Sequence, residues 1–190
     1  MQLWTIQTEA ALGKLECDGR LSSDRGLADA DFLTAYDWIS DQMRQRIGPS
    51  PAGVTSPLWA WYQYNSESKR RPDLRRRGHL PRGETGFLIE FWGDDESVVL
   101  SDFDLWYFVL NYWYLPATVA DGERFDSTLD RRYSWNDPAP HAIDQEIRDS
   151  WQRIFDLEWY DPELTCSPGE RQIQATLWEL TAESIVTIQK

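Results

Sequence analysis

Aromatic side chains concentrate in two short segments of this 190-residue chain, and they constrain its fold more than any other feature. Residues 58–64 have the length and composition of a β-strand, with aromatic side chains on both faces. Residues 105–115 are apolar or aromatic almost throughout and end before Pro116, which predicts a buried helix. Tryptophan (11) outnumbers tyrosine (8) and phenylalanine (7), and each indole buries a large apolar area. We therefore expect most tryptophans to lie in the core.

The order of the remaining segments predicts an α+β fold in a single domain over residues 1–190, with small twisted sheets and flanking helices. Five further segments have the composition and length of strands: residues 3–7, 86–92, 98–100, 172–180 and 185–188. A chain of this length can bury enough surface to form one core without a second domain.

Two helices are predicted in the first quarter of the chain, each from a capping residue followed by apolar residues at helical spacing. Thr8 is expected to cap a helix that ends at Gly19. Asp29 is expected to cap an amphipathic helix that continues to Ile47 and ends before Pro49.

The second half of the chain gives weaker signals. Ser101 is expected to cap the helix over residues 105–115, in a box-like arrangement with Asp104. Residues 117–136 are polar and acidic without a clear period, so no element is predicted there. The next helix is expected to begin at Pro138 and Pro140 and to carry its apolar residues on one face: Ile143, Ile147, Trp151, Ile154 and Phe155.

Charge is distributed unevenly along the chain. The net charge of -13 argues against a general polyanion-binding protein, yet residues 69–82 contain seven basic residues and one acid, Asp73. Two interpretations of this basic loop stay open. It is either a solvated loop whose arginines neutralise acidic neighbours, or an anion site for phosphate, pyrophosphate or a nucleic-acid backbone. Nucleic acid is not expected as a partner except through the loop from Lys69 to Arg82.

The chain is expected to be cytoplasmic and to have no membrane partner. Its apolar runs are far shorter than the roughly 20 residues that a membrane span requires. The first residues have no basic flank, no long apolar stretch and no cleavage site of a signal peptide. Cys17 and Cys166 could pair in principle, but a reducing compartment favours two ordinary thiols, which is the expectation.

Side chains that carry chemistry are scattered. Cys17, His79, His141 and Cys166 stand singly without the spacing of metal ligands, so no metal site is expected. Glu90 lies in an otherwise apolar strand. It could face solvent, pair with an arginine of the basic loop, or act as an acid with a raised pKa.

Six motifs together resemble a bacterial family known as domain of unknown function 3841. The motifs span nearly the whole chain and lie at residues 3–8, 59–64, 71–75, 100–106, 110–116 and 173–180. The family resemblance implies no activity.

A second resemblance concerns the fold alone. The opening strand and immediate helix, the aromatic strand and the late strand are similar in layout to ADP-ribosyltransferases, which cleave NAD between two small sheets. On that template Thr5 or Gln7 would hold the nicotinamide ribose, and Trp61 or Tyr62 would stack on the nicotinamide. Gln174 would take a late-strand position where active members usually carry glutamate. A glutamine can bond a ribose hydroxyl but supplies no negative charge.

Two functional hypotheses follow, and whether the chain is an enzyme stays open. The first is a nucleotide-binding enzyme with NAD as its substrate, in which Arg71 and Arg75, flanking Asp73, hold a pyrophosphate. Gln174 and Glu90 are its candidate catalytic residues. The second is a non-catalytic acidic module that binds a protein partner. If the late strand is purely structural, alternation predicts that Gln174 lies on a solvated face.

Overall fold

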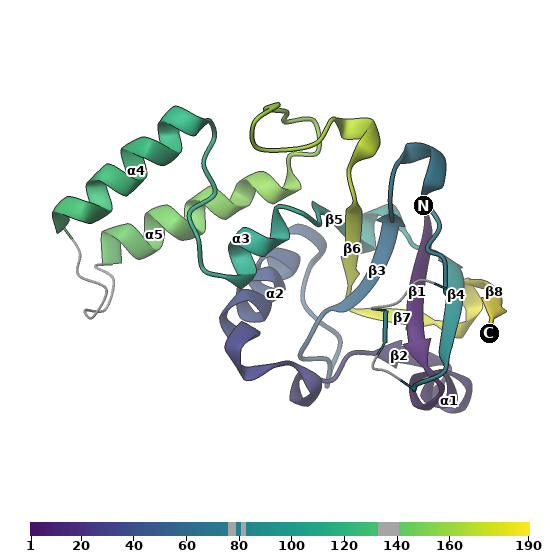
Figure 1. Cartoon of the computed structure of the whole chain (residues 1–190). Coiled ribbons are helices and arrows are strands. Elements are labelled where there is room, and N and C mark those ends of the chain that lie inside the picture. The colour runs from purple at the N-terminus through teal and green to yellow at the C-terminus, as the bar shows by residue number, and fades with distance from the viewer. Residues whose placement is uncertain (76–78, 81–82, 133–140) are drawn as a thin grey trace.

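β1 (Gln2–Thr8) lies inside a six-stranded antiparallel sheet with the order β5-β6-β3-β1-β4-β8 (Figure 1). The computed structural model describes residues 1–75, 79–80, 83–132 and 141–190. The other strands of the sheet are β3 (Leu58–Gln63), β4 (Gly86–Trp92), β5 (Val99–Asp102), β6 (Ile173–Leu177) and β8 (Ile185–Gln189). A separate two-stranded sheet pairs β2 (Arg20–Ser22) with β7 (Glu179–Thr181).

The strands of the large sheet do not pair equally. β1 and β4 pair along their full length, from Gln2 opposite Trp92 to Thr8 opposite Gly86. β1 and β3 share a single pair, Trp4 opposite Trp61. The sheet therefore opens between these two strands beyond that pair.

Five α-helices accompany the sheets in the described part of the chain: α1 (Glu9–Asp18), α2 (Leu33–Ile47), α3 (Trp106–Leu110), α4 (Val119–Arg132) and α5 (His141–Ser150). A 3-10 turn over Trp151–Phe155 follows α5. The Thr8 hydroxyl accepts from the Ala11 amide, and Gly19 ends α1 with a φ of 69°, which favours glycine. Of the described helices, none is long and apolar enough to cross a membrane.

Apolar residues form two main clusters. One contains Leu3, Ile89, Phe91 and Ala175 of the sheet, with Leu15 of α1. The other is rich in aromatic residues and joins α2, α3, α5 and the turn after α5. Five of the ten described tryptophans are buried, so the expectation that most indoles lie in the core holds for only half of them: Trp4, Trp38, Trp106, Trp151 and Trp178. Trp59, Trp61 and Trp159 are half-buried, whereas Trp92 and Trp113 are exposed.

The α+β class is confirmed, and so are most of the predicted strands and both early helices. The strand predicted over 172–180 divides into β6 and β7 around Trp178. The helix predicted over 105–115 ends early, because Tyr112 adopts a φ of 57° in the left-handed region that terminates helices. The prediction that the whole segment is buried is also wrong, since Tyr107 is 51% exposed and Trp113 is 57% exposed.

Two further predictions need correction. Ser101 lies within β5 and caps no helix. Asp102 instead caps the turn that leads into α3, because its Oδ1 accepts from the amides of Asp104 and Leu105 at 2.9 and 3.1 Å. The segment 117–136, predicted without an element, contains α4. Pro138 and Pro140, expected to begin the following helix, lie outside the described residues, and α5 is described from His141.

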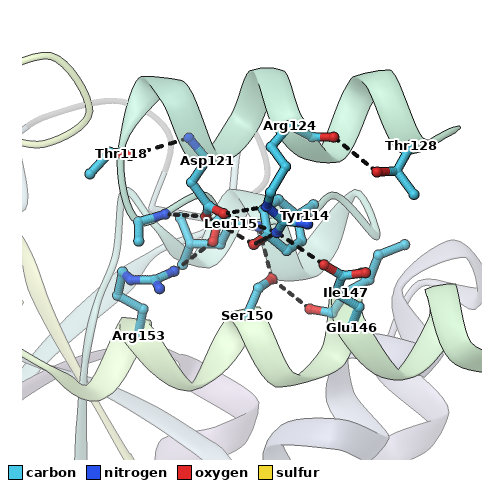
Figure 2. A network of polar contacts seen from close by, with 11 residues as sticks. Tyr114, Leu115, Thr118, Asp121, Arg124, Thr128, Glu146, Ile147, Ser150 and Arg153 are labelled. Atoms are coloured by element: carbon cyan, nitrogen blue, oxygen red, sulfur yellow. Dashed lines mark hydrogen bonds and ion pairs between the residues drawn. The ribbon is translucent and has the colours of Figure 1, made fainter. Parts of the chain in front are cut away.

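α4 and α5 lie side by side and are joined by polar contacts (Figure 2). Arg124 of α4 forms ion pairs of 3.0 Å with Asp121 and with Glu146 of α5. Asp121 also accepts from the Ala117 amide and the Tyr114 hydroxyl, each at 2.9 Å, and the Ala117 amide is the main cause of the lowered pKa of Asp121. These contacts bind the helix pair to the segment that leaves α3.

Arg171 is the most deeply buried cation described, with 1% of its area exposed. It donates to the carbonyl oxygens of Leu157 at 2.9 Å and Cys166 at 3.3 Å, and also to that of Trp159. Its Nε lies 3.6 Å from Oδ2 of Asp102, which is equally buried. Burial raises the pKa of the Asp102 carboxyl, although the Leu105 amide and Arg171 act in the opposite direction.

We predict that Arg171→Met lowers the free energy of unfolding by about 3–5 kcal/mol, because the Asp102 carboxylate stays buried without its cation. Urea unfolding followed by circular dichroism measures the change. The control is Arg44→Met, which removes an exposed pair with Asp41 and should cost less than about 1 kcal/mol. Equal losses in the two variants would contradict a structural role for the buried pair.

Candidate binding pocket between two strands

A pocket of about 590 Å³ occupies the opening between β1 and β3, within the usual range for small-molecule sites. β1 contributes Thr5 and Gln7, α1 contributes Lys14, and β6 contributes Gln174. Aromatic residues from β3 and from the region of α3 form the remaining wall: Trp59, Trp61, Phe103, Trp106 and Tyr107. Residues distant in sequence are thus brought together around one cavity.

A side-chain hydrogen bond accompanies the separation of the two strands. The Thr5 hydroxyl donates to the carbonyl oxygen of Trp59 at 2.9 Å, in place of a backbone amide of β1. The Gln7 side chain in turn donates from Nε2 to the Thr5 hydroxyl at 2.7 Å. Thr5 is 2% exposed, so the bond satisfies a carbonyl group that would otherwise lack a donor where β1 leaves β3.

The aromatic wall consists of two groups of rings. Trp59 and Trp106 have centroids 5.1 Å apart, and Tyr36 of α2 lies 6.2 Å from Trp59. Trp61 meets Phe103 at 4.9 Å in an edge contact, and Phe103 meets Tyr107 at 5.8 Å. Edge contacts fix the rings without stacking them face to face, which suits a wall against which a planar ligand can stack.

The polar wall combines buried and exposed groups. Gln174 is 4% exposed, and its Nε2 donates to the Ser101 hydroxyl at 3.1 Å. Lys14 and Asp24 are exposed, and the half-buried His79 ring lies 5.3 Å from the Tyr64 ring. The described lining can therefore offer hydrogen bonds, the ammonium group of Lys14 and the carboxylate of Asp24 to a ligand.

Four of the site residues predicted from the sequence line this pocket. They are Thr5, Gln7, Trp61 and Gln174. The prediction that a structural Gln174 would be solvated is wrong, because all five residues of β6 are buried. β6 lies between β5 and β3, and both of its faces are covered.

The other predicted site residues are not among the lining residues. Tyr62 lies under Arg70, whose guanidinium carbon is 4.1 Å from the ring centroid. Arg71 donates to Gln189 of the edge strand, and Arg75 pairs with Asp73 at 2.7 Å.

Glu90 also stands apart from the pocket lining. Its Oε2 accepts from the Trp4 indole at 3.2 Å, and its Oε1 accepts from the Gln2 side chain. Neither of these two bonds involves an arginine of the basic loop, which was one of the partners expected from the sequence.

The basic loop is only partly described, since Arg76, Arg77 and Arg82 lie outside the described residues. Its described arginines bind groups of the protein itself, and His79 alone of the described loop residues lines the pocket. The anion-site hypothesis for this loop stays a prediction.

Sequence reasoning missed much of the aromatic wall. Trp59 could have been found, because it lies two residues from Trp61 and shares its face of β3. Tyr36 and Tyr107 give no local signal, because only tertiary packing brings α2 and α3 to the pocket. Within the described chain, no cluster of His, Cys, Asp and Glu could hold a metal ion.

We predict that Thr5→Val lowers the free energy of unfolding by about 1–3 kcal/mol, because the Trp59 carbonyl loses its donor in a buried place. Chemical denaturation measures the loss. Thr187→Val on the exposed edge strand β8 is the matched control and should change stability by less than about 0.5 kcal/mol. A Thr5 variant as stable as this control would contradict the role given to the hydroxyl.

Comparison with known proteins agrees with the resemblance found in the motifs. The sequence profile of one family, described as a domain of unknown function, matches residues 2–186. The search of curated proteins and the search of solved structures each give no match. The family description carries no activity, so function has to be argued from the pocket. Because the match covers nearly its whole length, the chain belongs to the family Domain of unknown function (DUF3841).

Proposed function

We propose that the pocket between β1 and β3 binds a nucleotide, with NAD as the leading candidate. The observation that carries this proposal is that aromatic and polar side chains together line one cavity of about 590 Å³. A nucleotide combines a flat ring with hydroxyl and phosphate groups, and it needs both kinds of surface.

The aromatic wall suits the ring of such a ligand. Trp59 and Trp61 are half-buried and Tyr107 is 51% exposed, so part of each ring stays accessible beside the cavity. Stacking of a base on an aromatic side chain contributes about 1–3 kcal/mol.

The polar wall suits the rest of the ligand. The Gln7 and Gln174 side chains can bond to hydroxyl or amino groups. The Lys14 ammonium group is the fixed positive charge of the described lining, and it would meet a phosphate at the rim. Because the chain has a net charge of -13, an anionic ligand is repelled overall, and a local cation such as Lys14 would offset this repulsion.

Catalysis would require a stabilising group for the transition state in addition to ligand binding. Transfer of ADP-ribose from NAD develops positive charge on the ribose, which a carboxylate normally stabilises. Asp24 is the carboxylate among the described lining residues, and its side chain already accepts from the Gly26 amide. We therefore propose nucleotide binding and not catalysis. Incubating the chain with labelled NAD and a cell lysate distinguishes a transferase, which would label lysate proteins, from a binding protein, which would not.

We expect isothermal titration calorimetry to detect NAD binding to the wild-type chain. Tyr107→Ser should weaken it by about tenfold, because one stacking face is lost. Tyr160→Ser is the matched control: Tyr160 is also 51% exposed but does not line the pocket, so affinity should not change.

Two results would contradict the proposal. One is the absence of any heat of binding with NAD or ADP-ribose at millimolar concentration, which would favour the non-catalytic interaction module. The other is an equal loss of affinity in the Tyr107 and Tyr160 variants.

A further inference from the structure

We infer that the edge strand β8 is an interface at which two copies of this chain pair as antiparallel strands. The six-stranded sheets of the two copies join there into one continuous sheet, about a two-fold axis at Thr187. The inference is independent of the proposed nucleotide binding, because β4 separates β8 from the pocket strand β1.

The two edges of the large sheet differ in how they are covered. β5, at one edge, has three of its four residues buried. β8, at the other edge, has four of its five residues exposed, and among the described strands only β4 pairs with it (Figure 1). The outer side of an edge strand carries backbone N–H and C=O groups that can pair with a further strand. β8 therefore offers the backbone half of an interface.

The side chains of β8 lack the charges and prolines that commonly protect such an edge. Residues 185–189 include neither, in a chain that has 19 basic and 32 acidic residues. Val186 and Ile188 are large apolar residues that are 45% and 41% exposed. The register of β8 against β4 shifts at its start, but the pairs from Thr187 to Gln189 are consecutive. Alternation places Val186 and Ile188, two residues apart, on one face of the strand.

Antiparallel pairing about Thr187 makes these apolar side chains complementary to each other. Thr187 of one copy lies opposite Thr187 of the other, so Val186 lies opposite Ile188 on both sides of the axis. Side chains that are directly opposite across two strands have Cβ atoms about 5 Å apart and contact each other. Each exposed apolar residue of β8 thus gains an apolar partner from the second copy.

The two ends of β8 carry opposite charges. Arg71 donates to the last residue of the strand, and Lys190 follows it, so this end is basic. Glu183 lies just before the other end, and Asp94 lines a cavity together with Ser184, the residue before β8, so that end is acidic. Antiparallel pairing brings the basic end of each copy to the acidic end of the other, whereas parallel pairing brings like ends together. This charge pattern favours a second copy of the chain as the occupant of the edge.

Sedimentation velocity on the full wild-type chain measures the association. We expect a monomer–dimer equilibrium that depends on concentration. The dimer should be weak, because one pair of short strands buries less area than most stable interfaces do.

Two double variants test the register of the pairing. Val186→Lys with Ile188→Glu places a lysine opposite a glutamate on both sides of the axis, and it should dimerise within about threefold of the wild type. Val186→Lys with Ile188→Lys places like charges opposite each other and should weaken the dimer by at least about tenfold. The variant with two lysines is the less negative of the two, so general repulsion between the acidic copies would give the reverse order.

Val119→Lys on α4 is the control, because Val119 is 41% exposed, as Ile188 is, but lies outside β8. This variant should dimerise as the wild type does. Circular dichroism first establishes that each variant is folded. If the double variants do not fold, hydrogen exchange of the wild type at low and high protein concentration decides the question, and residues 185–189 should exchange more slowly at high concentration.

The proposal has four contrary outcomes. A wild-type chain that stays monomeric at high micromolar concentration would overturn it, and the edge would then be free for a strand of another protein. A dimer that the two-lysine variant leaves intact would overturn the role of β8. Equal weakening in both double variants would overturn the antiparallel register, and exchange in residues 185–189 that does not depend on concentration would contradict the interface itself.

Discussion

The bond from the Thr5 hydroxyl to the Trp59 carbonyl is the interaction on which the site depends. Antiparallel strands normally satisfy each other's backbone groups along their length, and β4 does so for β1. On its other side β1 has one backbone pair with β3, and beyond it a side chain supplies the donor. The sheet can therefore open in its interior without leaving this carbonyl unsatisfied, and aromatic residues of β3 stay half-buried beside the cavity.

The part of the aromatic wall nearest α3 depends on the buried pair of Asp102 and Arg171. Asp102 caps the turn that carries Phe103 into α3, so it positions two of the aromatic residues at the cavity, Phe103 and Tyr107. Arg171 binds backbone carbonyl oxygens of the segment between the turn after α5 and β6. Ser101, which accepts from the Gln174 amide, directly precedes Asp102. Three consecutive residues at the β5 edge of the sheet, Ser101, Asp102 and Phe103, thus bind Gln174, cap the turn before α3 and line the pocket.

Local signals account for the parts of the fold that the sequence could predict. Thr8 and Gly19 delimit α1 by capping chemistry, and β-strand composition and length marked most strands. α4 could not be found, because Phe125 is the one fully buried residue among those described and most of its other residues are polar or charged. The helix over residues 105–115 ends where Tyr112 adopts a left-handed backbone conformation. The sequence could not predict this end, because the segment is apolar on both sides of it.

The site was predictable only where it lies on regular strands. Thr5, Gln7, Trp61 and Gln174 were proposed together from a likeness in strand layout, and the structure places all four on one pocket. The choice between Trp61 and Tyr62 depended on the face of β3, where the register shifts between Trp61 and Gln63, and no local pattern marks this irregularity.

Hydrogen exchange measured by mass spectrometry, with and without saturating NAD, tests the central claim most directly. Binding in the opening between β1 and β3 predicts slower exchange in peptides that cover residues 5–11, 58–61 and 103–107, with no change in α4 or β8. Slower exchange confined to residues 69–82, or no change anywhere, would contradict it.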